Sequence, residues 1–259
     1  MTLDRTYGTA LPGLPAEPLP GKLIVIEGAD GSGRTTEVAL LKAWLEVEGH
    51  AVVDTGLRRS TLVSAEIDRA KQGHTLAAST LALLYAADFA DQLENKMVPA
   101  LSAGSTVLAD RYIYTLMARA VVRGASREYA RELYSFALRP HLVIFLDARP
   151  EILLHRAIGK YGSLDYWESG MDLSLSRDLF ESFYLYQDRL SREFEWMASE
   201  YDFHRVDANR FPEQVHADVQ KLVGPLYGSG PSGRAGPRLP RPPRARGRIS
   251  RAPRPAASE

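Results

Sequence analysis

The sequence predicts an α/β protein in three layers, with a central sheet of five parallel strands and helices on both faces. Short apolar runs alternate with longer amphipathic segments, which is the pattern of a parallel sheet covered on both sides. A glycine-rich turn follows the first apolar run directly. The chain has 259 residues, enough for one such domain with a substantial core.

Each element is expected from its own pattern of apolar residues and its end signals. The run 22–27 is almost wholly apolar, and Gly49 and Gly104 are plausible helix ends. The expected strands are 22–27, 51–54, 106–109, 142–147 and 203–206. The expected helices are 34–49, 61–71, 76–103, 113–123, 126–138, 150–158, 174–200 and 212–226.

Composition shifts divide the chain into three parts. Residues 1–20 hold four prolines with little periodicity and are expected to form a disordered leader. Residues 21–227 would form the domain. Residues 228–259 carry eight arginines and one glutamate, about +7, so the remainder carries about −7. We expect this tail to be disordered. It could touch nucleic acid, although a solvated extension is the reading we favour.

Several classes of function are disfavoured by composition. The chain has no cysteine, so disulfides, metal–thiolate sites and catalytic thiols are excluded. Its six histidines show no metal-ligand spacing. No apolar run approaches the ~18 residues of a membrane span. The N-terminus lacks the order of a signal peptide, so we expect a cytoplasmic protein with no membrane contact.

The glycine-rich turn has the spacing of a phosphate-binding loop, with arginine at the lysine position. Its residues are Gly28, Ala29, Asp30, Gly31, Ser32, Gly33, Arg34, Thr35 and Thr36. The glycines can adopt positive φ, and the following helix N-terminus favours an anion. An ordinary turn before a structural helix is the alternative. Arg34 keeps the charge, but its planar fork differs from a compact ammonium and could slow phosphoryl transfer.

Two residues are expected to hold Mg²⁺, and several basic residues to hold phosphate. Thr35 occupies the metal-binding hydroxyl position of the loop, and Asp110 ends the third strand beside it. The adjacent Arg111 could bind a phosphate bidentately, unless it forms only a local ion pair. Arg59, in the turn after the second strand, could bind a second phosphate or be merely solvated.

A glycine-containing segment, about 156–173, could close over bound phosphates as a short lid. Arg156 and Lys160 would supply its charge. Tyr161, Tyr166 and Trp167 are numerous aromatics for a loop, so we expect them to pack on the protein or on a ligand. An ordinary loop is the alternative.

Taken together, these motifs resemble the thymidylate kinases, which are P-loop NTPase-fold nucleoside monophosphate kinases. The resemblance covers about 22–226. The matching stretches are Glu27–Gly33 (E-G-x-D-G-S-G), Leu83–Asp88 (L-L-F-A-A-D), Pro99–Leu101 with Gly104, Asp110–Tyr112 (D-R-Y) and Asp207–Ala208 (D-A). The resemblance implies ATP and Mg²⁺ as cofactors and a nucleoside monophosphate as partner, with a homodimer possible.

The resemblance also implies roles for individual residues. Asp30 would hold the acceptor's sugar hydroxyl or order the metal. Arg59 and Arg111 would bind the acceptor phosphate, and Tyr85 would stack on its base. Because Gly31 stands where some members carry an arginine, the lid residues Arg156 and Lys160 would offset charge on the transferring group, together with Arg34.

The departures from the family pattern concentrate around the acceptor. Phe89 replaces the arginine that reads the thymine edge, Thr115 replaces a serine, and Arg119 begins the stretch that replaces an aromatic-glutamine-glycine sequence. We include all three among the expected acceptor contacts. The turn at Arg58–Arg59 lacks the usual proline, and Tyr166 replaces a lid arginine. Relative to the family pattern, the residues expected to bind phosphate are therefore largely retained, while those expected to recognise the base are changed.

The leading hypothesis is phosphoryl transfer from ATP to dTMP. One alternative is the same fold acting on a different acceptor, suggested by Phe89 and Arg119. The other is a nucleotide-binding regulatory protein with little kinase activity, suggested by Arg34 and by the sparse lid charge.

Overall fold

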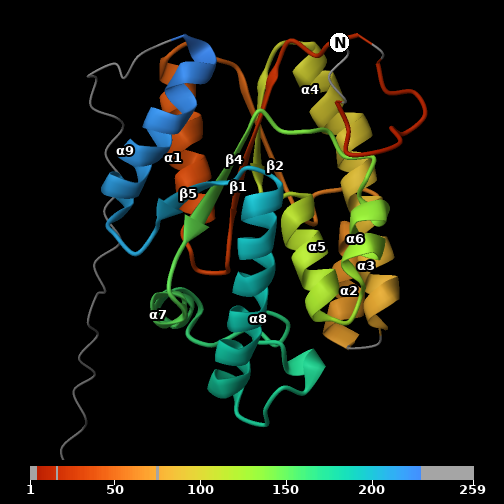
Figure 1. Ribbon diagram of the computed structural model, residues 1–259, viewed down its shortest axis with the longest axis vertical. Helices are drawn as coiled ribbons and strands as arrows, with labels where there is room; N and C mark the ends of the chain where they lie inside the picture. The colour runs from red at the N-terminus through yellow and green to blue at the C-terminus, as the bar shows by residue number, and fades with distance from the viewer. Residues whose placement is uncertain (1–4, 16, 74–75, 229–259) are drawn as a thin grey trace, which may run out of the picture.

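A five-stranded parallel sheet forms the centre of the computed structural model, which describes residues 5–15, 17–73 and 76–228 (Figure 1). The strand order is β2-β3-β1-β4-β5. All four neighbouring pairs are parallel. The strands are β1 (Lys22–Gly28), β2 (Val52–Gly56), β3 (Thr106–Asp110), β4 (Leu142–Asp147) and β5 (His204–Asp207). The expected α/β fold is confirmed.

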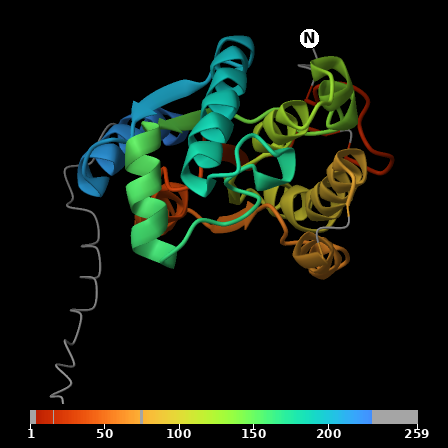
Figure 2. The ribbon, with the colours of Figure 1, turned by 90° about the horizontal axis from the view of Figure 1, so that it is seen from below.

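Helices cover both faces of the sheet because alternate side chains of each strand point to opposite sides. From β1, Ile24 and Ile26 pack with α1 (Arg34–Val47) and α9 (Pro212–Val223). Leu23 and Val25 belong to the larger cluster on the other face. That face is covered by α3 (Ala78–Gln92), α4 (Val98–Ser102), α5 (Ile113–Val122) and α8 (Leu179–Glu200). Figures 1 and 2 show the three layers.

The remaining elements connect or flank these layers. They are α2 (Ser64–Gly73), α6 (Arg127–Leu133), α7 (Pro150–Tyr161), η1 (Leu93–Met97), η2 (Met171–Leu173) and η3 (Gly224–Tyr227). The helix expected over 76–103 is α3, a π-helical turn η1 and α4. Pro99 lies in the first turn of α4, and a proline there removes an N–H that would continue a regular helix. Helix α8 begins at Leu179, where the Asp178 side chain accepts from Glu181 N–H at 2.8 Å.

The segment 5–15 differs from the disordered leader expected for residues 1–20. Thr6 forms an antiparallel bridge with Leu138. The Tyr7 hydroxyl lies 2.5 Å from that of Tyr114 on α5. Leu11, Leu14 and Leu19 pack against the larger core cluster. These apolar side chains, spaced between the prolines, give the segment enough buried surface to dock. Most of the tail expected to be disordered, 229–259, lies outside the described residues.

Within the part of the chain that the structure describes, no helix is both long and apolar enough to cross a membrane.

Candidate active site

The phosphate-binding loop connects the end of β1 to the start of α1, and its glycines are required by its shape. Gly28, Gly31 and Gly33 have φ values of 148°, 86° and 101°. A Cβ on Gly28 would lie 2.6 Å from Ser32 Oγ, and one on Gly31 would lie 2.9 Å from the Leu153 carbonyl oxygen. The first turn of α1, with its free N–H groups, therefore starts at a narrow, glycine-lined concavity.

Arg34 folds back beneath this loop. Its guanidinium donates to the carbonyl oxygens of Gly28 and Ala29, and Nε donates to Asp110 Oδ1 at 3.1 Å. Nη2 lies 3.5 Å from Asp30 Oδ1. The residue is only 7% exposed. Most of its N–H donors are therefore directed at the protein and not into the open part of the loop.

Asp110 and Thr35 form the pair of oxygen donors expected beside the loop. Thr35 Oγ1 donates to Asp110 Oδ2 at 2.8 Å. A carboxylate and a hydroxyl at this separation suit Mg²⁺, which prefers oxygen ligands and commonly keeps waters and substrate phosphates. Among the described residues, no group of three or more His, Asp or Glu side chains could hold a metal by itself.

Asp30 is surrounded by three arginines. Besides Arg34, Arg119 Nη2 lies 2.8 Å from Asp30 Oδ2, and Arg111 forms an ion pair with Oδ1. Arg111 has a left-handed backbone with φ 72°, a strained conformation for a residue with a side chain. Its Nε is buried without a hydrogen-bond partner. Burial, together with the nearby Arg119, lowers the pKa of Arg111 to about 10.

A cleft of about 840 Å³ opens over the loop. The loop residues from Asp30 to Thr36 line it, as do Arg59, Asp110, Arg111 and Arg156. Arg59 donates to Asp54 Oδ2 at 2.8 Å. Arg156 donates to the Ala208 carbonyl at 2.9 Å and approaches the Ser32 carbonyl at 3.3 Å. Arg156 thus connects the loop to the turn after β5, and burial lowers its pKa.

A second, smaller cavity of about 30 Å³ lies between α2, α3 and α5. Tyr85 and Arg119 line it, together with Lys71, Arg123 and Trp167. Asp30 lies between the two spaces, because its carboxylate contacts Arg119 from the second cavity and Arg111 from the cleft. The expected donor and acceptor residues are therefore divided between two adjacent spaces.

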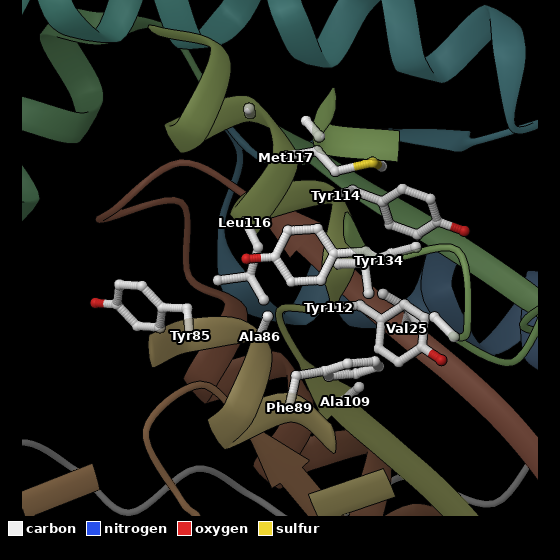
Figure 3. Packing of buried hydrophobic residues seen from close by; sticks show 14 of the residues in the cluster. Val25, Tyr85, Ala86, Phe89, Ala109, Tyr112, Tyr114, Leu116, Met117 and Tyr134 are labelled. Atoms are coloured by element: carbon white, nitrogen blue, oxygen red, sulfur yellow. The ribbon is translucent and has the colours of Figure 1, made fainter. Parts of the chain in front are cut away.

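Two of the expected acceptor contacts do not line either space. Phe89 is 4% exposed, and its ring centroid lies 5.0 Å from that of Tyr112. Figure 3 shows Phe89 beside Tyr112 in the core, while the ring of Tyr85 points away from them. Thr115 donates to Glu27 Oε2 at 2.5 Å. Glu27 is fully buried, and burial raises its pKa. We therefore correct both assignments: these side chains hold β1, α3 and α5 together.

The segment between α7 and α8 lies against the second cavity. Arg123 on α5 pairs with Asp172, with Nε 2.7 Å from Oδ2. The Trp167 indole N–H donates to the Lys71 carbonyl at 3.1 Å. Figure 2 shows this segment running from α7 towards α2 and α5. Two residues of the segment expected to act as a lid, Arg156 and Glu168, line the cleft, and closure of this segment over bound phosphates stays a prediction. The side chain of Lys160 lies outside the described residues.

Comparison with known proteins identifies the family. The model of the family described as thymidylate kinase matches residues 26–219. The chain belongs to the thymidylate kinase family. A protein of Saccharolobus solfataricus called "Probable thymidylate kinase 2" is 35% identical over 205 residues, covering 79% of this chain and 96% of its own. The thymidylate kinase of Jannaschia sp. is 33% identical over 221 residues, covering 80% and 97%. A "Probable thymidylate kinase" of Pyrococcus abyssi is 33% identical over 215 residues, covering 78% and 96%.

The thymidylate kinase match runs from within β1 to within α9 and so includes all five strands and both spaces. Sequence reasoning missed Lys71 and Arg123 as residues lining the second cavity. Neither belongs to a recognisable motif, and only folding brings them together. Trp167 could be singled out from the sequence, because aromatic residues are uncommon in a glycine-containing loop.

Proposed function

We propose that this thymidylate kinase family member transfers the γ-phosphoryl group of ATP to dTMP, producing ADP and dTDP. The observation that carries the proposal is one carboxylate, Asp30, placed between a phosphate-binding loop and a pair of arginines. Arg111 contacts it from the cleft and Arg119 from the second cavity. Donor and acceptor phosphates would meet in the cleft beside Asp30, and the second cavity would receive the base of the acceptor.

The loop would hold the donor. Gly31 and Gly33 let the backbone approach the phosphates closely, and the N-terminus of α1 favours their charge. Thr35 and Asp110 would hold Mg²⁺, which neutralises charge on the donor phosphates when it is bound. Arg34 would preserve the shape of the loop through its carbonyl contacts. Arg156 would fix the loop against the turn after β5.

The arginines around Asp30 would bind the acceptor. Arg111 and Arg59 line the cleft and would bind its phosphate, and Arg119 would approach from the second cavity. Asp30 would accept a hydrogen bond from the sugar hydroxyl. Tyr85 would lie against the base, because its ring lines the second cavity and points away from the core (Figure 3).

The chemistry would depend mainly on positioning and charge neutralisation. An oxygen of the acceptor phosphate forms a bond to the γ-phosphorus, and the bond from this phosphorus to the β–γ bridging oxygen breaks, so that ADP leaves. The arginines would stabilise the charge spread over the transferring oxygens. No side chain needs to form a covalent intermediate.

We propose action in the cytoplasm and pairing of two copies along α3, where Leu83 is 53% exposed although it is a large apolar side chain. Light scattering of the purified chain measures its molar mass in solution and tests the pairing.

The activity is tested by supplying ATP and Mg²⁺ with a panel of nucleoside monophosphates that includes dTMP and dUMP. We expect turnover with dTMP to exceed that with the others. Turnover confined to another monophosphate would retain the chemistry and reject dTMP as the acceptor. ATP binding without transfer to any acceptor would contradict the enzyme proposal and leave a nucleotide-binding protein.

A further inference from the structure

Three cations line the second cavity, and two of them have carboxylate partners. Arg119 pairs with Asp30 at 2.8 Å. Arg123 pairs with Asp172 at 2.7 Å and also donates to the Tyr186 hydroxyl at 2.9 Å. These contacts fix both guanidiniums in place from the side of α5. Both guanidiniums therefore already have carboxylate acceptors on the protein.

Lys71 is the third cation, and it comes from α2 on the opposite wall. Within the described residues, its ammonium forms neither a hydrogen bond nor an ion pair, and it lies 5.7 Å from the Trp167 ring centroid. The side chain is partly buried. A partly buried ammonium without an acceptor loses hydration and gains little in return, so the site favours a ligand that supplies an oxygen.

The other groups around Lys71 define what that ligand can be. Arg119 and Arg58 repel its charge, and Asp165 and Glu168 attract it from a distance. The walls between them are apolar or aromatic: Leu81, Ala82, Tyr85 and Leu116. Flat apolar walls with one donor at the edge suit a nucleobase whose exposed edge carries a carbonyl oxygen. An exocyclic amino group at the same place would direct its hydrogens at the ammonium.

We propose that Lys71 determines the base specificity of the acceptor site by donating a hydrogen bond to the carbonyl oxygen at position 4 of a pyrimidine. The inference rests on the proposed function for the identity of the acceptor. It assigns base recognition to α2, whereas Phe89, at the position where the sequence comparison expects a base-reading arginine, is buried beside Tyr112. The base would insert between Tyr85 and the 162–178 segment.

The second cavity is too small for a base in this structure, so Trp167 must move when a base binds. About 30 Å³ accommodates roughly one water molecule, which is far less than a pyrimidine ring needs. Trp167 closes the cavity, and its indole N–H is bonded to the backbone of Lys71 itself. Entry of the base therefore separates Trp167 from α2. The fluorescence of Trp167, measured in a variant whose other two tryptophans, Trp44 and Trp196, are replaced by phenylalanine, reports occupancy independently of catalysis.

The test compares two nucleotides that differ only at the base edge, dTMP and 5-methyl-dCMP. Their affinities are measured by calorimetry for the unaltered protein and for Lys71→Met, which keeps the length of the side chain and removes its charge. A hydrogen bond from a charged donor changes affinity by roughly 10- to 100-fold. We expect Lys71→Met to lose affinity for dTMP by about this factor and to bind 5-methyl-dCMP within about threefold of the unaltered protein.

Arg69→Met is the matched control. It removes a cation from the same helix, where the Arg69 side chain is 74% exposed and, among the residues that the structure describes, pairs only with Glu66. We expect no change in either affinity. Equal loss of both nucleotides in Lys71→Met, or no preference for dTMP in the unaltered protein, would overturn the inference. Selective binding of dTMP that depends on Lys71 but yields no product would instead contradict the proposed function and leave the inference standing.

Discussion

Arg34 is the residue whose surroundings differ most from what its position in the loop suggests. A compact ammonium there would act as a point charge towards a phosphate, whereas the guanidinium has five donors in a fixed plane. Here those donors contact two loop carbonyls and two carboxylates. In the proposed function, the arginine would therefore act on bound phosphate mainly through the shape of the loop and the placement of Asp30 and Asp110.

Replacing Arg34 with lysine tests this interpretation. Lysine has three donors at one point and cannot reach both carbonyls and both carboxylates. We expect Arg34→Lys to lower kcat with dTMP by about tenfold and to lower the melting temperature by a few degrees, as the loss of about 1–2 kcal/mol in buried hydrogen bonds implies. Steady-state kinetics and calorimetric melting are the measurements. A large gain in kcat would show that the arginine is a handicap.

Single residues also mark the limit of prediction from sequence. The loop glycines, Thr35 and Asp110 could be placed because local spacing fixes their geometry. Phe89 and Thr115 could not, because a linear motif does not say which way a helical side chain points. Lys71 could not be found at all, since its importance comes from an α2 position that only the tertiary fold brings beside α3 and α5.

At the scale of elements, the turn after β2 is held in place by α3. Asp88 is fully buried and accepts hydrogen bonds from the backbone N–H of Arg58 at 2.9 Å and of Ser60 at 3.0 Å. Gln92 donates to the same carboxylate at 2.9 Å. One side chain of α3 thus fixes the turn that carries Arg59 into the cleft.

Substituting Asp88 with asparagine keeps the shape but turns one acceptor oxygen into a donor that faces another donor. We expect Asp88→Asn to raise the KM for the acceptor about tenfold through displacement of the Arg59 turn, with a smaller change in the KM for ATP. Initial-rate kinetics with each substrate varied separately measure the two effects. Equal changes in both values would argue against a role confined to this turn.

Helices α1 and α9 are connected by a buried polar pair. Glu37 Oε1 lies 2.8 Å from His216 Nδ1, and burial raises the pKa of Glu37. We expect His216→Leu alone to destabilise the fold by about 3 kcal/mol, because it leaves a buried carboxyl without its partner. The double variant Glu37→Leu with His216→Leu should recover much of this loss. Denaturant unfolding of the two single variants and the double variant gives the coupling energy.

At the scale of the whole molecule, the sheet order and the two helical layers could be predicted because apolar periodicity and parallel topology are properties of the sequence. The path of segment 5–15 could not. Its prolines predict a disordered leader, while the contacts that fix it lie on α5 and at Leu138, far along the chain. The π-helical turn η1 was likewise missed, because nothing in its local periodicity differs from that of an α-helix.

Removing this segment tests its contribution to stability. Tyr7, Leu11 and Leu14 are only partly buried, so a chain starting at residue 15 should lose about 1–3 kcal/mol. We expect a lower melting temperature and an unchanged kcat, since none of these residues lines either space. A fall in kcat at a temperature where the shortened chain is fully folded would show that the segment also supports the site.

Acceptor binding should vary with pH because Lys71 titrates near charged groups from three parts of the fold. Burial, then repulsion by Arg119 and Arg58, lowers the pKa of Lys71 to about 8, while Asp165 and Glu168 oppose this shift. Burial raises the pKa of Tyr85, which remains neutral. Because Lys71 loses its proton as the pH rises through about 8, the preference for dTMP over 5-methyl-dCMP should fall between pH 8 and 9. Both nucleotides carry the same phosphate, whose second pKa is about 6, so its titration cancels in the ratio of their affinities. Calorimetry should show that this ratio does not change with pH for Lys71→Met.

The carboxylate of Asp30 already occupies the space between three guanidiniums before any nucleotide arrives. On the proposed assignment of these arginines to the acceptor, an incoming phosphate would exchange with a resident anion and would not enter an empty cationic pocket. The affinity would then reflect the difference between two anions for the same arginines. It also means that added salt should weaken acceptor binding less than the number of arginines suggests, because the arginines are already screened from within.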